Sequence, residues 1–92
     1  MTDIKEYPLV IIEWMDAQSD SDWTDMEKVG CELATIQTVG FIVSETRQGL
    51  AVASSLDTTN GAASMVMVIP KKWCVKITPL GSVEPVVNET MN

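Results

Sequence analysis

The sequence predicts a small, mainly β protein whose five short antiparallel strands form a barrel or a small sandwich. Short runs rich in Val, Ile, Ala and Met alternate with clusters of Gly, Pro, Asn and Asp, which is typical of strands joined by tight turns. The 92 residues are 46% hydrophobic and 21% charged, a composition typical of a globular domain. Closure into a barrel would remove the exposed strand edges that favour aggregation.

The first strand and a short helix are expected in the first third of the chain. Pro8–Met15 is a run rich in β-branched residues between a proline and an acidic loop, which indicates a strand. In that loop, Asp22 with Asp25 three positions later suits a helix start. We therefore expect one short helix over about 23–29, ended by Gly30. The side chains at three-residue spacing on one side of this helix are Trp23, Met26 and Val29.

The middle of the chain is predicted to form a hairpin. Residues 33–45 have the pattern of a long strand that bends at Gly40, because glycine inside a β pattern often marks a bulge or a tight bend. Arg47 to Gly49 supply the turn, in which Gly49 can take a positive φ. Residues 50–54 then return as the partner strand.

Two further strands complete the predicted sheet. The Asn60-Gly61 pair ends a polar loop, and residues 65–69 form the next strand. Pro70 ends that strand because it lacks a backbone donor. After a brief turn at Lys71-Lys72, residues 73–77 form the last strand.

The length of the chain fits a single domain. We expect one β-barrel domain over residues 1–80 and a tail over residues 81–92 that is flexible or docks on a neighbour. A domain of this size has a limited core. A homo-oligomer is therefore expected, since association buries more apolar surface.

The charge distribution argues against a nucleic-acid polymer as the ligand. The net charge is −7, and residues 1–45 hold ten acids against two lysines, a balance of −8. Residues 46–83 carry a balance of +3. An acidic field of this size repels polyanions and attracts basic partners, so double-stranded DNA is not expected to bind.

The sequence also predicts a cytoplasmic protein. No apolar run approaches the roughly 20 residues that span a bilayer, so no membrane association is expected. The first residues carry Asp3 and Glu6 in place of a basic region followed by an apolar one. In the absence of an export signal, Cys31 and Cys74 are expected to be reduced and mostly buried thiols.

Catalysis is not expected. The chain has no histidine, and a nucleophilic serine or cysteine needs a base within hydrogen-bond reach. Its five glycines are scattered singly, so no phosphate-binding loop or cofactor site is predicted. The carboxylates Asp20, Asp22 and Asp25 lack the glycine and the distant glutamate of a calcium loop, so helix capping and solvation explain them better than a metal.

Two binding surfaces are nevertheless candidates. The first is a cationic segment around an aromatic ring, which could stack a nucleotide base and hold its phosphate. Lys71, Lys72 and Lys76 lie around Trp73 in this segment, and Arg47 is a further candidate for the same site. The alternative is that these lysines protect a strand edge while Trp73 packs in the core.

The second candidate surface is acidic and aromatic. Tryptophans beside an acidic loop make good interface anchors, although they are more often core or staple residues. The residues of this surface are Trp14, Asp16, Asp20, Asp22, Trp23 and Asp25, with Glu27 adjacent.

The strand spacing and a few residues follow a pattern found in a known family of proteins. The residues that carry this pattern are Trp14-x-Asp16-Ala17, Trp23, residues 38–43, residues 53–57 and Ile69-Pro70-Lys71-Lys72 with Ile77. Over residues 8–80 the chain thus resembles small phage-encoded proteins with an SH3-like or Sm-like barrel. The resemblance implies a virus-encoded accessory protein that acts by binding in a bacterial cytoplasm.

Two functions from different classes remain open. In one, the protein is a counter-defence factor that sequesters a small nucleotide signal at the cationic segment. In the other, the acidic surface docks on a host protein, which it inhibits or adapts.

Overall fold

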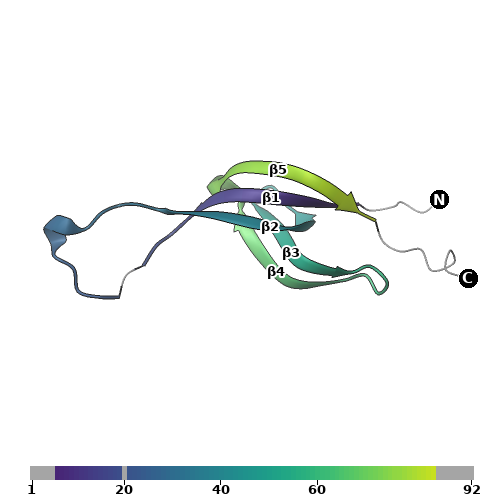
Figure 1. Ribbon diagram of the computed structural model, residues 1–92, viewed down its shortest axis with the longest axis horizontal. Helices are drawn as coiled ribbons and strands as arrows, with labels where there is room; N and C mark the ends of the chain where they lie inside the picture. Colours follow the sequence, from purple (N-terminus) through teal and green to yellow (C-terminus); the bar gives the residue numbers. More distant parts are fainter. Residues whose placement is uncertain (1–5, 20, 85–92) are drawn as a thin grey trace, which may run out of the picture.

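The computed structural model describes residues 6–19 and 21–84, which form one five-stranded antiparallel sheet (Figure 1). The strand order is β4-β3-β2-β1-β5. The mainly β prediction is therefore confirmed. The strands are β1 (Tyr7–Asp16), β2 (Ala34–Glu45), β3 (Gly49–Asp57), β4 (Ala62–Pro70) and β5 (Cys74–Val83).

The sheet is open, so the expectation of a closed barrel is not met. Strand β4 pairs with β3, and β5 pairs with β1. Between β4 and β5 lies the short 3-10 turn η2 (Lys71–Trp73), which carries the chain from one edge of the sheet to the other. Because β4 and β5 are the two edges of the order, the barrel lacks the strand pair that would close it.

Strand β2 joins the two halves of the sheet. Its first part, up to Phe41, pairs with β1, and the part from Phe41 onward pairs with β3. Figure 1 shows β1 and β5 above β3 and β4, with β2 between them. An added Cβ on Gly40 would lie 2.6 Å from Val52 Cγ1 and 2.7 Å from the carbonyl oxygen of Ala53. Glycine thus permits close approach of β3 at the predicted bend.

The core lies between these two halves. Alternate residues of β1 enter it, as the two-residue period of a strand requires. It is small even for a chain of this length, and much apolar surface remains exposed. The buried hydrophobic residues of the described chain are Val10, Ile12, Trp14, Leu50, Val52, Ala53 and Ile69.

The predicted helix over 23–29 is wrong. Only the 3-10 turn η1 (Met26–Lys28) forms, and the Asp25 side chain caps it by accepting a hydrogen bond from the backbone N–H of Glu27 at 3.1 Å. No element covers the expected apolar side: Trp23 is fully exposed and Met26 is 90% exposed. A helix this short depends on packing of that side for its stability.

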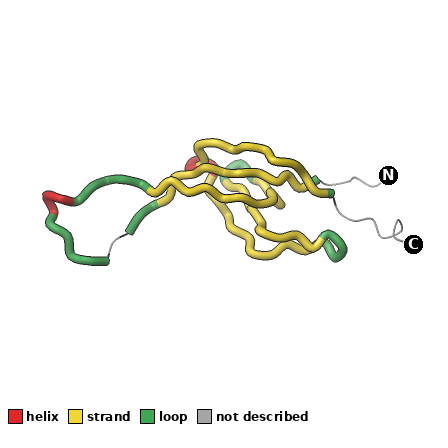
Figure 2. The backbone as a smooth tube through the Cα atoms, viewed as in Figure 1, coloured by secondary structure: helices red, strands yellow, loops and turns green. Residues whose placement is uncertain are grey.

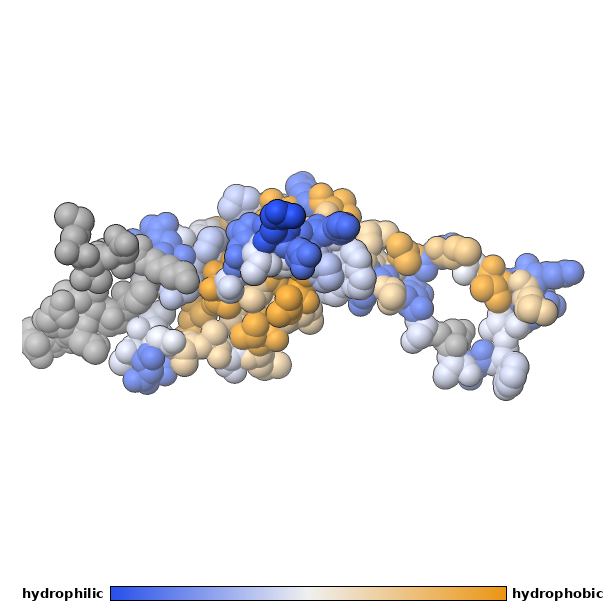
Figure 3. All heavy atoms as spheres, turned by 180° about the vertical axis from the view of Figure 1, so that it is seen from behind, coloured by the Kyte–Doolittle hydropathy of each residue, from blue (hydrophilic) through white to orange (hydrophobic). Residues whose placement is uncertain are grey.

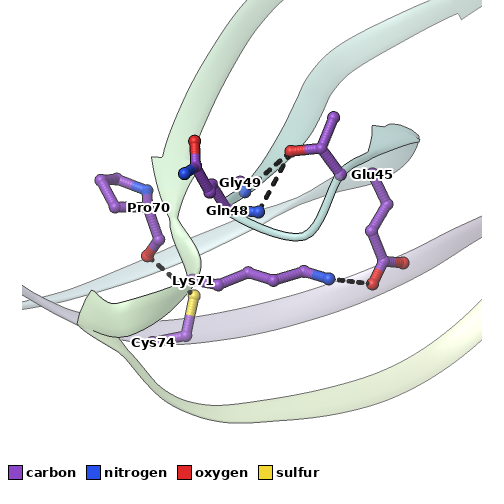
Figure 4. Close-up of polar contacts among 7 residues, drawn as sticks. Glu45, Gln48, Gly49, Pro70, Lys71 and Cys74 are labelled. Atoms are coloured by element: carbon purple, nitrogen blue, oxygen red, sulfur yellow. Dashed lines mark hydrogen bonds and ion pairs between the residues drawn. The ribbon is translucent and has the colours of Figure 1, made fainter.

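The turn between β2 and β3 also differs from expectation. Gly49 does not have a positive φ; among the described glycines, that conformation occurs at Gly61, with φ 69°. The side chain of Thr46 organises the turn, since its Oγ1 accepts hydrogen bonds from the backbone N–H groups of Gln48 and Gly49 at 3.3 and 3.1 Å (Figure 4).

Strand β5 runs further than the sequence predicted. Gly81 pairs with Leu9 and Val83 pairs with Tyr7, so the start of the expected 81–92 tail belongs to the sheet. Residues 85–92 lie outside the described residues. Within the described part, no helix has the length and apolar character needed to cross a membrane.

Candidate binding surfaces

The connection between β1 and β2 projects from the sheet as a long arm, residues 17–33 (Figures 1 and 2). It contributes to the elongated shape of the molecule, whose principal extents are 67 × 22 × 21 Å. Every described residue of the arm is exposed. The arm is therefore available to a partner along its whole described length.

The arm combines large apolar side chains with carboxylates. Met26 lies in the turn η1 and Trp23 precedes it. Val29 and Leu33 follow the turn, and all four side chains are exposed. Trp23, Asp22 and Asp25 of the predicted acidic surface lie here, and Asp16 lies at the base of the arm. Asp20 lies outside the described residues. The acidic side chains described in the arm are Asp22, Asp25, Glu27 and Glu32.

Trp14 does not belong to this surface, contrary to the prediction. Its side chain is 7% exposed and lies in the core. Its indole Nε1 donates a hydrogen bond to Thr38 Oγ1 at 3.0 Å. The alternative that assigned Trp14 to the core is confirmed, whereas for Trp23 that alternative is wrong.

The predicted cationic residues meet at one corner of the sheet, which we call the basic corner (Arg47, Lys71 and Lys72). The backbone N–H of Lys71 donates to the carbonyl of Gln48 at 2.8 Å, which joins η2 to the turn that carries Arg47. The Lys71 ammonium forms an ion pair with Glu45 (Figure 4). Of these three cations, only Lys71 has a carboxylate partner among the described residues.

Trp73 stands at the border between the core and this corner. Its ring stacks on Trp14, with centroids 6.4 Å apart and an interplanar angle of 14°. It is nevertheless 44% exposed, so one part of the ring packs and another is open to solvent. The sequence left open whether Trp73 packs in the core or offers its ring to a ligand, and the ring is partly packed and partly exposed.

A hollow of about 350 Å³ lies beside Trp73, between η2 and the base of the arm. It brings Lys72 and Trp73 of the first predicted surface together with Asp16 of the second. Its walls are mainly apolar, as is usual for small-molecule sites. The lining residues are Met15, Asp16, Ala17, Leu33, Lys72, Trp73, Cys74 and Val75.

The two cysteines lie in different surroundings, and the prediction of mostly buried thiols is wrong for Cys31. Cys31 is exposed on the arm, and Cys74 is half-buried at the hollow. Burial raises the pKa of the Cys74 thiol, an effect that the nearby Lys71 charge partly offsets. The thiol donates a hydrogen bond to the carbonyl of Pro70 at 3.6 Å. Both observations favour the protonated form.

The acids of the arm do not assemble into a metal site in the described part of the chain, where no cluster of metal-ligating side chains occurs. The arm encloses a second hollow of about 560 Å³. It is the open interior of the loop, lined largely by polar side chains such as Gln18, Thr24 and Glu32.

One exposed surface was not predicted from the sequence. Met65, Val66, Met67 and Val68 of β4 are all exposed. Figure 3 shows apolar surface gathered over the β3–β4 side of the sheet, below a strongly hydrophilic cluster. The signal was present in the sequence, because the segment from Ala62 to Pro70 contains no charged residue.

Comparison with protein-family models, with curated proteins and with solved structures finds no match to this chain.

Proposed function

We propose that this protein is a non-enzymatic accessory binding module that captures a partner protein with its arm. The observation that carries the proposal is the exposure of Trp23 and Met26 on a projecting acidic loop. A few large anchors supply most of the binding energy at many interfaces, and tryptophan is prominent among them. A partner pocket that covers these side chains gains the apolar area that they expose to water.

The partner's surface has a chemistry opposite to that of the arm. Asp22, Asp25 and Glu27 are next to the apolar anchors in the sequence of the arm, so the complementary surface is a basic rim around an apolar pocket. Charge complementarity of this kind accelerates association and makes it sensitive to salt. Inhibition or adaptation of a host protein is the role that fits such docking.

The proposal includes a phage origin and an SH3-like or Sm-like architecture. In the strand order β4-β3-β2-β1-β5, the last strand lies beside the first and the two edges are β4 and β5. Pairing of those edges would convert this sheet into a five-stranded barrel. The strand order therefore supports an opened barrel.

A photo-crosslinking amino acid at Trp23, in the full chain expressed in bacterial cells, tests the arm. The matched control carries the same group at Thr59, an exposed position in the β3–β4 turn. We expect a crosslinked protein that appears with the arm position and is absent with the control position. Equal crosslinking from both positions would overturn the proposal.

The affinity and association rate of arm variants for the purified partner then test the roles of Trp23 and of the carboxylates. Trp23→Ala is expected to weaken binding by about 2 kcal/mol or more, as at other interface anchors. Asp22→Asn with Asp25→Asn is expected to slow association at low salt, with a smaller effect at high salt. Glu84→Gln, an exposed acid outside the arm, serves as the control. Unchanged affinity in the arm variants would contradict this function.

A second candidate function rests on the hollow beside Trp73. The exposed part of the Trp73 ring offers a stacking platform, and Lys72 in the same hollow has no carboxylate partner among the described residues. Base stacking on an aromatic ring contributes about 1–3 kcal/mol, and the ammonium group would hold a phosphate. This candidate function is sequestration of a small nucleotide signal, as a counter-defence factor would require.

Native mass spectrometry with ATP and cyclic AMP as probes separates this candidate from the first. We expect the wild type to retain a nucleotide mass and Trp73→Ala with Lys72→Glu to lose it while remaining folded. Lys76→Glu makes the same charge change opposite Glu13, away from the hollow. Retention by the double variant, or no retention by the wild type, would exclude these nucleotides as ligands.

A further inference from the structure

Strand β4 is an unprotected edge of the sheet. Natural edge strands usually carry lysine, proline or a bulge that blocks pairing with another chain. Strand β4 carries no charged residue, and its only proline, Pro70, is its last residue. Val66 and Val68 expose 49% and 70% of their surface. This edge is therefore chemically suited to accept a further strand.

The opposite edge, β5, is protected. Its register against β1 shifts twice, which leaves Val75 and Leu80 without a paired residue on β1. Pro79 lies within the strand and cannot donate a backbone hydrogen bond. Lys76 adds a charge. Of the two edges, only β4 combines an unshifted register with an uncharged apolar sequence.

The hydrogen bonds at the end of β4 show which backbone groups face outward. Gly49 lies opposite Pro70, and the Lys71 N–H donates to the Gln48 carbonyl at 2.8 Å. That bond connects the residues flanking the Gly49–Pro70 pair, so the pair is of the non-hydrogen-bonded type. The register continues without a shift to Val66. By alternation, the N–H and C=O groups of Val66 and Val68 point away from β3.

We propose that two copies of this chain associate through antiparallel pairing of their β4 strands about a two-fold axis at Met67. In this arrangement Val66 of one copy lies opposite Val68 of the other. The two residues exchange both outward-facing backbone hydrogen bonds, and symmetry repeats the pair. The two sheets then form one continuous sheet, in which the exposed apolar side chains of each β4 lie beside those of the other copy.

The charges at the two ends of β4 favour a second copy as the occupant. Lys71 and Lys72 follow the strand, whereas Asp57 lies opposite Ala62 at its start. In this register Lys72 of each copy points toward the start of β4 in the other copy, where Asp57 lies one strand away on β3. Lys71 is already paired with Glu45. Most contacts between two chains of net charge −7 would be repulsive. The neutral strip of β4 avoids that repulsion.

The backbone at Met65 limits the length of the pairing. Its φ of 54° is in the left-handed region, and the β3–β4 register omits it. The regular part of the edge therefore extends from Val66 toward Pro70. The Met65 side chain is 79% exposed and lies beside the partner strand, where it can pack on the joined sheet.

Sedimentation velocity of the purified full chain tests the proposal. We expect the wild type to have twice the monomer mass of 10.1 kDa. Val68→Pro removes an outward-facing N–H and Val68→Lys places like charges near each other; both are expected to give monomers with an unchanged circular dichroism spectrum. Val39→Lys is the control, because Val39 is exposed in the centre of the sheet, and it is expected to remain a dimer.

A disulfide tests the position of the axis. In the Cys31→Ser background, Met67→Cys places two thiols opposite each other in a non-hydrogen-bonded pair, with Cα atoms about 4.5 Å apart, within the range of a disulfide. We expect mild oxidation to crosslink Met67→Cys and to leave Val39→Cys uncrosslinked. A monomeric wild type, assemblies larger than a dimer, or a dimer that survives Val68→Lys would each overturn the proposal.

Discussion

Thr38 of β2 accepts a hydrogen bond from the indole Nε1 of Trp14 on β1, at 3.0 Å. The rest of the Trp14 side chain packs in the core and stacks on Trp73, so this hydrogen bond satisfies its one polar group. Thr38→Val keeps the shape of the side chain and removes the acceptor. The indole N–H is then left without a partner in a mostly buried position.

We expect Thr38→Val to lower the free energy of unfolding by about 1–2 kcal/mol, the usual penalty for an unsatisfied buried donor. Urea denaturation followed by tryptophan fluorescence measures it. Thr35→Val on the same strand is the control, because the Thr35 hydroxyl is exposed and contacts only the sulfur of Met15. Equal stability losses in the two variants would show that the indole bond contributes little.

Gly40 gives the second prediction. Gly40→Ala places a methyl group against Val52 and the backbone of Ala53, at distances shorter than any normal contact. The backbone of β3 must shift, so we expect a loss of about 1–3 kcal/mol or more in the free energy of unfolding. Gly81→Ala, which meets no atom within 4 Å, should leave the denaturation midpoint nearly unchanged. A stable Gly40→Ala variant would mean that β3 can move away from β2 at little cost.

The strands could be predicted because their signals are local. The alternation of Val10, Ile12 and Trp14 places three side chains on one face of β1, and that face is buried. Closure into a barrel is not local, because it depends on pairing between β4 and β5 across the whole fold. No local sequence pattern indicates whether β4 and β5 pair with each other.

The sites were predicted less completely, for a related reason. Lys71 and Lys72 are neighbours of Trp73 in the sequence. Arg47 joins them only through the pairing of β3 with β4 and the bond from the Lys71 N–H to the Gln48 carbonyl, which the sequence did not predict. Trp23 and Trp14 are the same residue type, yet one is fully exposed and the other is in the core. Three-residue spacing predicted a helix at Trp23, but a helix forms there only if another element covers its apolar side.

The third prediction concerns pH and Asp57. Hydrogen bonds from the side chain and backbone of Asn60 and from the backbone of Thr59 hold the pKa of the Asp57 carboxyl below its usual range. The lowered pKa means that the ionised form stabilises the β3–β4 turn above the pKa of the unfolded chain. This contribution is lost as the pH falls through the folded pKa.

An NMR titration of the Asp57 carboxyl carbon measures this pKa directly. Asn60→Ala removes the first of these hydrogen bonds and should move the pKa back toward the ordinary value for aspartate. The stability difference between wild type and Asn60→Ala should be present at neutral pH and should disappear in acid. An Asp57 pKa that is the same in both proteins would contradict the assignment.

The fourth prediction concerns the two thiols. Alkylation requires the thiolate, and burial together with the hydrogen bond to Pro70 keeps Cys74 protonated. Iodoacetamide at pH 7.5 should therefore label Cys31 on the exposed arm well before Cys74, as peptide mass spectrometry can resolve. In urea the two labelling rates should converge. Equal rates in the native protein would show that Cys74 is more accessible than its surroundings indicate.

The position of β1 has a consequence for the order of folding. Strand β1 pairs with β2 on one side and with β5, the last strand of the sheet, on the other. During synthesis, the hairpins β1–β2 and β3–β4 can form as soon as their turns emerge, but the second edge of β1 has no partner until residues 74–83 follow. Pairing across that separation must overcome a larger loss of loop-closure entropy than hairpin formation does, and non-local pairing is therefore slower. Docking of β5 is therefore expected to limit the folding rate, and substitutions at the β1–β5 pair should slow folding more than equally destabilising ones in the β3–β4 hairpin.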